Sequence, residues 1–129
     1  MLSALCVGAG GFLGAVLRYV LGLLPWQSDF PLITFCINFV GAFLIGAIAE
    51  FAIQRVDQFN PQLILFLKTG FCGGFTTFST FSLETLTLLD KGRFVMAGAY
   101  AFGSLAVCLA GVMAGRALVR MFLAAPAVS

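Results

Sequence analysis

The chain has 129 residues, of which 61% are hydrophobic and 9% are charged, with a formal net charge of +2. A soluble domain carries about 25% charged residues, so this composition excludes a soluble globular protein and indicates an integral membrane protein. The length suits a single domain, 1–129. The small net charge and the lack of a basic cluster give no support for a nucleic-acid partner. The sequence contains no histidine, the commonest general base.

The first expected element is a membrane-spanning helix over residues 4–24, interrupted by Arg18 near its far end. Residues 1–19 lack the basic leading region and the cleavage signal of a secretory signal peptide, so we interpret them as part of a retained span. Residues 25–29 are expected to connect this span to the next and to place Trp26 at the membrane interface.

A second span is expected over residues 31–53 and a turn over 55–61 that includes Asp57. The third apolar run, residues 62–89, is longer than one crossing requires. The extra residues are what a membrane-spanning helix needs if it is broken in its middle. A charged turn over 90–93 then leads to the fourth span.

The fourth span is expected over residues 94–118, with a short, frayed tail after Arg120. The predicted fold is therefore an all-α membrane protein of four transmembrane helices, the third broken mid-membrane. An even number of crossings places both termini on the same side of the membrane.

The basic residues are divided evenly between the two sides of this arrangement. With Lys68 left out because it lies inside the third run, three fall on each side: Arg55, Arg116 and Arg120 opposite Arg18, Lys91 and Arg93. Orientation normally follows an excess of basic residues on the cytoplasmic side. Either the chain inserts both ways up and forms an antiparallel homodimer, or so few charges fail to report a single orientation.

The segment 70–81 combines three glycines with four hydroxyl side chains inside an apolar run. We expect the helical hydrogen bonds to fail around Gly73 and Thr76 and to free carbonyl oxygens, which suit a hard cation such as sodium. Two copies meeting across a twofold axis could surround one ion with such oxygens. The alternative is an unbroken, glycine-rich helix packed tightly against a neighbour.

Phe78 and Phe81 lie three residues apart and share a helix face, with the hydroxyls of Ser79 and Thr80 between them. An aromatic ring has a positive edge against which an anion can lie. The alternative is ordinary packing, the usual role of a phenylalanine in a chain that has 15 of them.

Polar side chains also enter the second and fourth spans. Asn38 can donate two hydrogen bonds, and Thr34 lies one turn earlier. Tyr100, Ser104 and Cys108 recur at four-residue intervals. Rows of neutral donors can replace the water shell of a small anion; hydrogen bonding between helices is the alternative.

Four charged residues lie inside the runs: Arg18, Glu50, Lys68 and Glu84. Arg18 and Glu50 are near span ends, where a side chain can reach the interface, and Arg18 could draw anions into a vestibule. For Lys68 and Glu84 we expect pairing or exposure to a cavity. None of the four has a catalytic partner in the sequence, so no enzyme site is predicted.

Three motifs together resemble the Fluc (CrcB) fluoride channel family. These are Gly-Phe-Cys-Gly-Gly-Phe-Thr-Thr-Phe-Ser-Thr-Phe-Ser-Leu-Glu at 70–84, Gly-Ala-x-x-Arg-Tyr at 14–19 and Ile-Asn-Phe-Val-Gly at 37–41. The resemblance covers nearly the whole chain, and the motif at 70–84 is highly specific.

The resemblance implies a dual-topology homodimer with two antiparallel fluoride pores and one central sodium ion that is structural and not transported. The sodium ligands map to the backbone carbonyls of Gly73 and Thr76. The pore residues map to Asn38, Phe78 and Phe81 and to a polar track of Thr34, Tyr100 and Ser104. This chain departs from the family where the track often has a further serine, because it has Cys108, whose thiol is a weak donor.

The expected function is passive export of fluoride from the cytoplasm across the inner membrane of a bacterium. The alternative is a proton-coupled exporter of the small multidrug-resistance type. That class uses a carboxylate in the first span, and residues 1–28 contain no Asp or Glu. A non-transporting assembly subunit is a third possibility, but it would leave the broken third span without a purpose.

Overall fold

The computed structural model describes residues 1–55 and 60–124, and this part of the chain contains helices, turns and irregular backbone but no strand. The elements in chain order are α1 (Leu2–Gly22), α2 (Leu32–Gln54), α3 (Pro61–Ile64), the π-helix η2 (Leu65–Cys72), α4 (Gly73–Phe75), α5 (Phe78–Asp90) and α6 (Phe94–Ala124). The prediction of an all-α protein is confirmed for the described residues.

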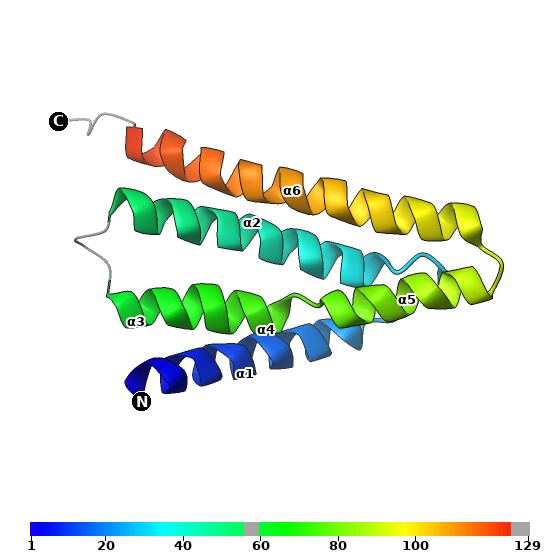
Figure 1. Cartoon of the computed structure of the whole chain (residues 1–129), viewed down its shortest axis with the longest axis horizontal. Helices are drawn as coiled ribbons and strands as arrows, with labels where there is room; N and C mark the ends of the chain where they lie inside the picture. The colour runs from blue at the N-terminus through cyan, green and yellow to red at the C-terminus, as the bar shows by residue number, and fades with distance from the viewer. Residues whose placement is uncertain (56–59, 125–129) are drawn as a thin grey trace.

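Helices α1, α2 and α6 are each long and apolar enough to cross a membrane. The chain runs back and forth between the two ends of an elongated bundle, and α3 to α5 together make one passage between those ends (Figure 1). The start of α1 and the end of α6 therefore lie at the same end of the bundle (Figure 1).

Two expected boundaries differ from the structure. The first helix ends at Gly22, slightly before residue 24, and the following residues up to Pro31 are not helical. The last helix continues to Ala124 instead of ending near residue 118, so the prediction of a frayed chain directly after Arg120 is wrong for residues 121–124. The predicted turn at Asp57 lies outside the described residues.

The third passage begins where Asn60 caps α3, its side chain accepting a hydrogen bond from the backbone N–H of Gln62 at 2.9 Å. The helical backbone continues through η2 and α4 to Phe75. Thr76 and Thr77 then adopt extended backbone, with ψ angles of 156° and 113°, before α5 begins.

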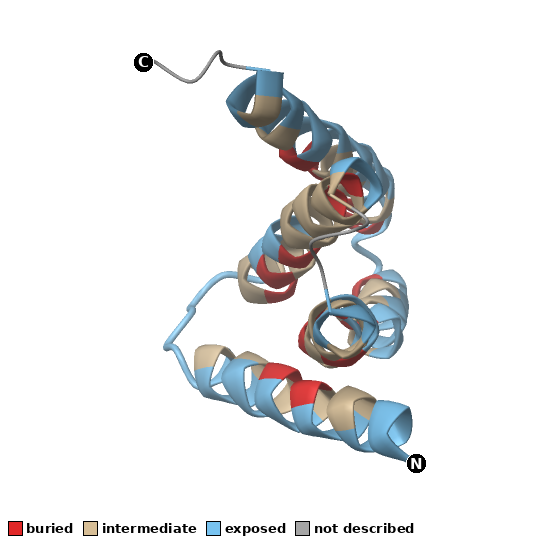
Figure 2. Cartoon of the chain, turned by 90° about the vertical axis from the view of Figure 1, so that its left-hand side faces the viewer, coloured by how far each residue is buried: buried red, intermediate tan, exposed pale blue. Residues whose placement is uncertain are grey.

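Small residues set how closely the helices approach one another. Gly10 and Gly14 are the buried residues of α1, and they face backbone atoms of η2 and α4. In the same way Gly115 of α6 faces the backbone of α2 at Phe43. Figure 2 shows the buried residues of α1 on the side that faces the rest of the bundle. The spaced glycines of α1 and α6 thus serve packing within one chain.

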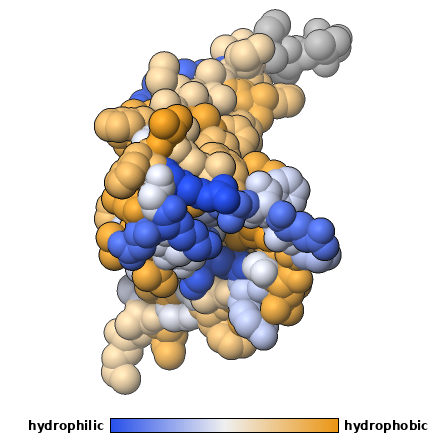
Figure 3. All heavy atoms as spheres, turned by 90° about the vertical axis from the view of Figure 1, so that its right-hand side faces the viewer, coloured by the Kyte–Doolittle hydropathy of each residue, from blue (hydrophilic) through white to orange (hydrophobic). Residues whose placement is uncertain are grey.

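Hydrophilic residues gather at the end of the bundle where α5 turns into α6 and α1 connects to α2 (Figure 3). Arg93 and Asp29 form an ion pair there, with 2.7 Å between Nη1 and Oδ2. The surrounding surface is largely hydrophobic (Figure 3), as expected where lipid takes the place of water.

We expect Gly14→Ala to lower the stability of the folded chain. A Cβ at position 14 would meet the backbone of Phe71 in η2 and of Phe75 in α4. Helical hydrogen bonds hold both backbone segments in place, so neither can move away easily. Overpacking of this kind typically costs about 1–3 kcal/mol. The measurement is the thermal unfolding midpoint of the purified protein in detergent.

The matched control is Gly8→Ala, on the same helix, because a Cβ at position 8 would meet nothing within 4 Å. It should leave the midpoint unchanged or raise it slightly, since alanine is the better helix former. Equal midpoints for the two variants would show that the close approach of α1 is not needed.

Candidate functional site

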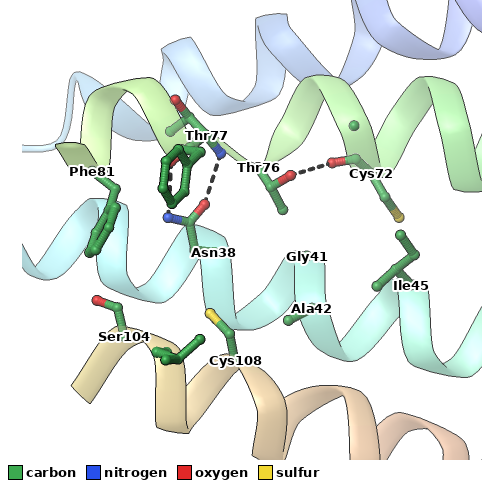
Figure 4. A pocket seen from close by; sticks show the side chains of 13 residues that line it. Asn38, Gly41, Ala42, Ile45, Cys72, Thr76, Thr77, Phe81, Ser104 and Cys108 are labelled. Carbon is green, nitrogen blue, oxygen red and sulfur yellow. Dashed lines mark hydrogen bonds between the residues drawn. The ribbon is translucent and has the colours of Figure 1, made fainter. Parts of the chain in front are cut away.

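The site is built around the interruption at Thr76 and Thr77. The side-chain amide of Asn38 pairs with the Thr77 peptide on both sides: Thr77 N–H donates to Oδ1 at 2.8 Å, and Nδ2 donates to the Thr77 carbonyl at 3.2 Å (Figure 4). Asn38 thereby supplies the two hydrogen bonds that the extended Thr77 backbone cannot make within a helix. This leaves one N–H of the Asn38 amide for another partner.

Thr77 is the N-cap of α5. Its hydroxyl oxygen accepts from the Thr80 backbone N–H at 3.2 Å, which satisfies one of the unpaired donors of the new helix. The Thr77 hydroxyl also donates to the Thr80 hydroxyl at 2.9 Å and lies 3.3 Å from that of Ser79. The predicted residues Ser79 and Thr80 are therefore held together by a residue that was not predicted as part of the site.

The carbonyl oxygens of residues 73–76 at the interruption have no helical donor among the described backbone hydrogen bonds, and those of Gly73 and Thr76 are the two predicted as ion ligands. The donor for Gly73 would be the N–H of Thr77, which pairs with Asn38 instead. The donor for Thr76 would be the N–H of Thr80, which pairs with the Thr77 hydroxyl. No hydrogen bond to either oxygen is found among the described residues. Gly73 is also exposed, and a Cβ there would meet nothing within 4 Å.

Arg18 reaches from α1 to the same interruption. Its Nε donates to the Gly74 carbonyl at 3.2 Å, a contact between residues 56 positions apart in sequence. The carbonyl end of a helical run carries partial negative charge, which a guanidinium complements. Arg18 also lines a pocket at this position, so the vestibule role expected for it stays a prediction.

A pocket of about 330 Å³ opens beside the interruption, between α2, α5 and α6 (Figure 4). It brings together six of the residues predicted for the site: Asn38, Gly73, Thr76, Phe78, Phe81 and Ser104. Cys108 lines it as well. None of the residues that line this pocket is charged, so its polar contacts come from neutral groups.

Ser104 has the one buried side-chain oxygen without a hydrogen-bond partner among the described residues. The residue is 6% exposed. A buried hydroxyl without a partner costs about 1–3 kcal/mol, so such a group normally has a ligand or a water. The Phe78 and Phe81 rings lie at the same pocket with centroids 5.5 Å apart.

A second pocket lies on the other side of Thr77, which lines both. It holds three more of the predicted residues, Arg18, Thr34 and Thr80, together with Glu84. The predicted residues Ser79 and Tyr100 line neither pocket. Most of the predicted pore residues therefore line two neighbouring pockets that share Thr77.

Tyr100 and Thr34 are joined through Glu84. The Tyr100 hydroxyl donates to Oε2 at 2.7 Å, and the Thr34 hydroxyl donates to Oε1 at 2.8 Å. Tyr100 is fully buried, and its ring packs against Phe81 with centroids 5.2 Å apart. Of the two outcomes expected for Glu84, pairing or exposure to a cavity, the structure shows pairing, and both of these donors are neutral hydroxyls.

The site prediction left out Thr77 and Glu84. A threonine directly before a helix start is an N-cap signal, which would have singled out Thr77. An ionisable residue inside a span is a functional candidate by default, which applies to Glu84. The two remaining charged residues of the apolar runs have different surroundings. Glu50 is buried against α6, whereas Lys68 is exposed.

Comparison with known proteins places the chain in a family. The family profile described as "CrcB-like protein, Camphor Resistance (CrcB)" matches residues 5–116. The chain belongs to the CrcB family. As expected for this family, it is a multi-pass membrane protein.

Relatives named "Fluoride-specific ion channel FluC" are similar to this chain over nearly its full length. The protein from Chlorobaculum tepidum is 45% identical over 124 residues, covering 95% of this chain and 98% of its own. The protein from Ruminiclostridium cellulolyticum is 43% identical over 123 residues, covering 93% of this chain and 94% of its own. The family resemblance inferred from the three motifs is confirmed.

Proposed function

We propose that this chain is a fluoride-specific channel that lets fluoride leave the cytoplasm by passive electrodiffusion. The names of the relatives support fluoride as the permeant ion. The observation that carries the proposal is the unpartnered Ser104 hydroxyl in a pocket that also presents the Asn38 amide and two aromatic rings. Neutral donors can replace the water shell of fluoride without a fixed charge to trap it.

The proposed path uses the two pockets in sequence. Arg18 attracts the anion into a vestibule next to Thr80. The free N–H of Asn38, the ring edges of Phe78 and Phe81 and the hydroxyl of Ser104 then replace its water. In this path Thr34 belongs to the vestibule pocket, and Tyr100 packs against the Phe81 ring beside the path. The proposed activity is transport without chemical reaction, so the site has no catalytic residue.

The proposed assembly is an antiparallel homodimer of four-span chains, whose third crossing is broken mid-membrane at Thr76 and Thr77. Three features support it: the even division of basic residues, the passage made by α3 to α5, and the exposed Gly73 at the interruption. Each chain is a single membrane domain that contributes to two pores. A channel that lowers cytoplasmic fluoride must act in the membrane around the cytoplasm, so we place it in the bacterial inner membrane.

The carbonyl groups of Gly73 and Thr76 fit a sodium ion, because both oxygens lack donors among the described residues and neutral oxygens suit a hard cation. One chain offers two such oxygens, and the second copy of the dimer would offer two more. The ion would be structural: its charge would hold the two interruptions together and would not move with fluoride.

The small multidrug-resistance type of exporter, considered as the alternative, is not favoured. The family match and the relatives named as fluoride channels argue against it. A fluoride-electrode efflux assay in liposomes separates the two, because a proton-coupled drug exporter would not release fluoride.

We expect Asn38→Asp to abolish fluoride efflux from liposomes. The substitution places a negative charge in the anion path, and it also replaces the Nδ2 donor to the Thr77 carbonyl by an oxygen that repels it. The measurement is the initial rate of efflux from liposomes of the reconstituted variant, followed with a fluoride electrode. Normal efflux would refute the assignment of Asn38 to the pore.

The matched control is Asn60→Asp, the same change at a residue outside both pockets. Asn60 caps α3 through its side-chain oxygen, and aspartate caps a helix equally well. Wild-type efflux by this variant would show that the effect at position 38 is local.

We expect Ser104→Ala to slow fluoride efflux by roughly 10- to 100-fold while the protein stays folded, because one hydrogen bond to a charged ligand contributes about 1.5–3 kcal/mol. The control is Ser82→Ala, since the Ser82 hydroxyl donates to the Phe78 carbonyl of its own helix at 2.8 Å. Equal efflux by the two variants would exclude Ser104 from the path. The measurement is the same liposome assay at matched protein density.

We expect sodium to stabilise the assembled protein against heat, because an ion that binds only the folded state adds about 2.7 kcal/mol at 100 times its Kd. The unfolding midpoint in detergent should rise with sodium chloride but not with N-methylglucamine chloride at the same ionic strength. Potassium chloride tests whether the ion size matters. Identical midpoints in sodium and N-methylglucamine would rule out a structural sodium ion.

A further inference from the structure

A second polar cluster, unrelated to the pockets, lies where α2 and α6 end. We call it the Glu50 cluster; it consists of Glu50, Gln54, Arg116 and Arg120. Both helices end at the same end of the bundle (Figure 1). The cluster holds two guanidinium groups for one carboxylate, so it keeps one positive charge in excess.

The carboxylate lies behind the two arginines. The Glu50 side chain is 4% exposed, whereas those of Arg116 and Arg120 are 46% and 58% exposed. Arg116 Nε donates to Oε2 at 2.8 Å, and Arg120 Nε donates to Oε1 at 2.7 Å. Gln54 completes the set with a hydrogen bond to Oε1 at 2.9 Å. Glu50 therefore orients both guanidinium groups through their inner nitrogens.

Three of the four outer nitrogens of the two arginines remain available among the described residues. Arg120 Nη2 makes a longer contact to Glu50 at 3.2 Å. The two Nη atoms of Arg116 and the Nη1 of Arg120 have no acceptor among the described residues. Guanidinium donors in this arrangement match the oxygens of a phosphate group. Because Glu50 already holds the side chains in place, a ligand would lose little entropy in ordering them.

The depth of the Glu50 cluster matches that of a lipid headgroup. Arg116 lies 22 residues after Phe94, which corresponds to roughly 33 Å of helix. The start of α6 adjoins the hydrophilic end of the bundle (Figure 3), so it belongs near one membrane surface. A hydrocarbon core of about 30 Å then puts Arg116 and Arg120 at the opposite surface.

The surface of α6 toward the bilayer centre is apolar. Met113 lies one turn before Arg116 and is 71% exposed, and Leu109 lies one turn further. A phosphate on the arginines would thus have its acyl chains beside exposed apolar side chains. A free phosphate ion would make only the first of these contacts.

We propose that the Glu50 cluster binds the headgroup of an anionic phospholipid such as phosphatidylglycerol. The residual positive charge of the cluster favours an anionic lipid over a zwitterionic one of the same chain length. This inference is independent of fluoride conduction, because none of the four residues lines either pocket.

The test is native mass spectrometry of the purified protein, mixed with equal amounts of phosphatidylglycerol and phosphatidylcholine with identical acyl chains. The wild type should retain phosphatidylglycerol preferentially. Arg116→Gln/Arg120→Gln should lower that preference by about fivefold for each arginine. This double variant leaves Glu50 buried without a cation, so Glu50→Gln/Arg116→Gln/Arg120→Gln serves as a second variant without the unpaired charge.

The matched control is Lys91→Gln/Arg93→Gln, which removes the same number of basic charges at the opposite end of the bundle and should leave the preference nearly unchanged. An unchanged preference in the cluster variants would overturn the proposal, as would an equal loss in the control. Loss of lipid on addition of excess inorganic phosphate would point to a phosphate-ion site instead. Dissociation of a dimer with no change in lipid retention would show that a second copy covers the arginines.

Discussion

The structure depends on how the polar backbone groups at Thr76 and Thr77 are satisfied. An unpaired peptide group inside a membrane protein costs several kcal/mol, because no water is at hand to pair with it. The Asn38 amide pairs with both groups of the Thr77 peptide, and Arg18 pairs with the Gly74 carbonyl. Side chains from α1 and α2 thus stabilise a backbone conformation in a segment far away in sequence.

These contacts explain the close approach of α1. Arg18 can reach Gly74 only if its helix lies near the segment that carries the interruption. Gly10 and Gly14 allow this approach because they leave room for backbone atoms of η2 and α4. Gly14 therefore supports the contact that Arg18 makes one turn further along α1. Packing brings the helix close, and the guanidinium then pairs with a carbonyl that the interruption leaves available.

Hydropathy and residue type predicted the long helices, the position of the polar residues and the unusual character of the 70–81 segment. Each of these depends on residues that are neighbours in sequence. Sequence did not predict the π-helix over Leu65–Cys72, the docking of Arg18 on Gly74, or the partners of Glu50 and Glu84. Those features depend on which helices become neighbours in space, and a single sequence carries no direct record of that.

The hydrogen bonds of Glu84 place a constraint on any anion path. The hydroxyls of Thr34 and Tyr100 have one proton each, and both protons point to the Glu84 carboxylate. An anion that is to bind these hydroxyls must compete with a carboxylate that already holds them. Ser104, one turn along α6 from Tyr100, has no such partner. Its hydroxyl is therefore free to donate to an incoming ion, whereas that of Tyr100 can do so only when it leaves Glu84. Tyr100 and Ser104, which are neighbours in the polar row on α6, thus differ in whether their hydroxyl can bind an anion, although they lie only one helical turn apart.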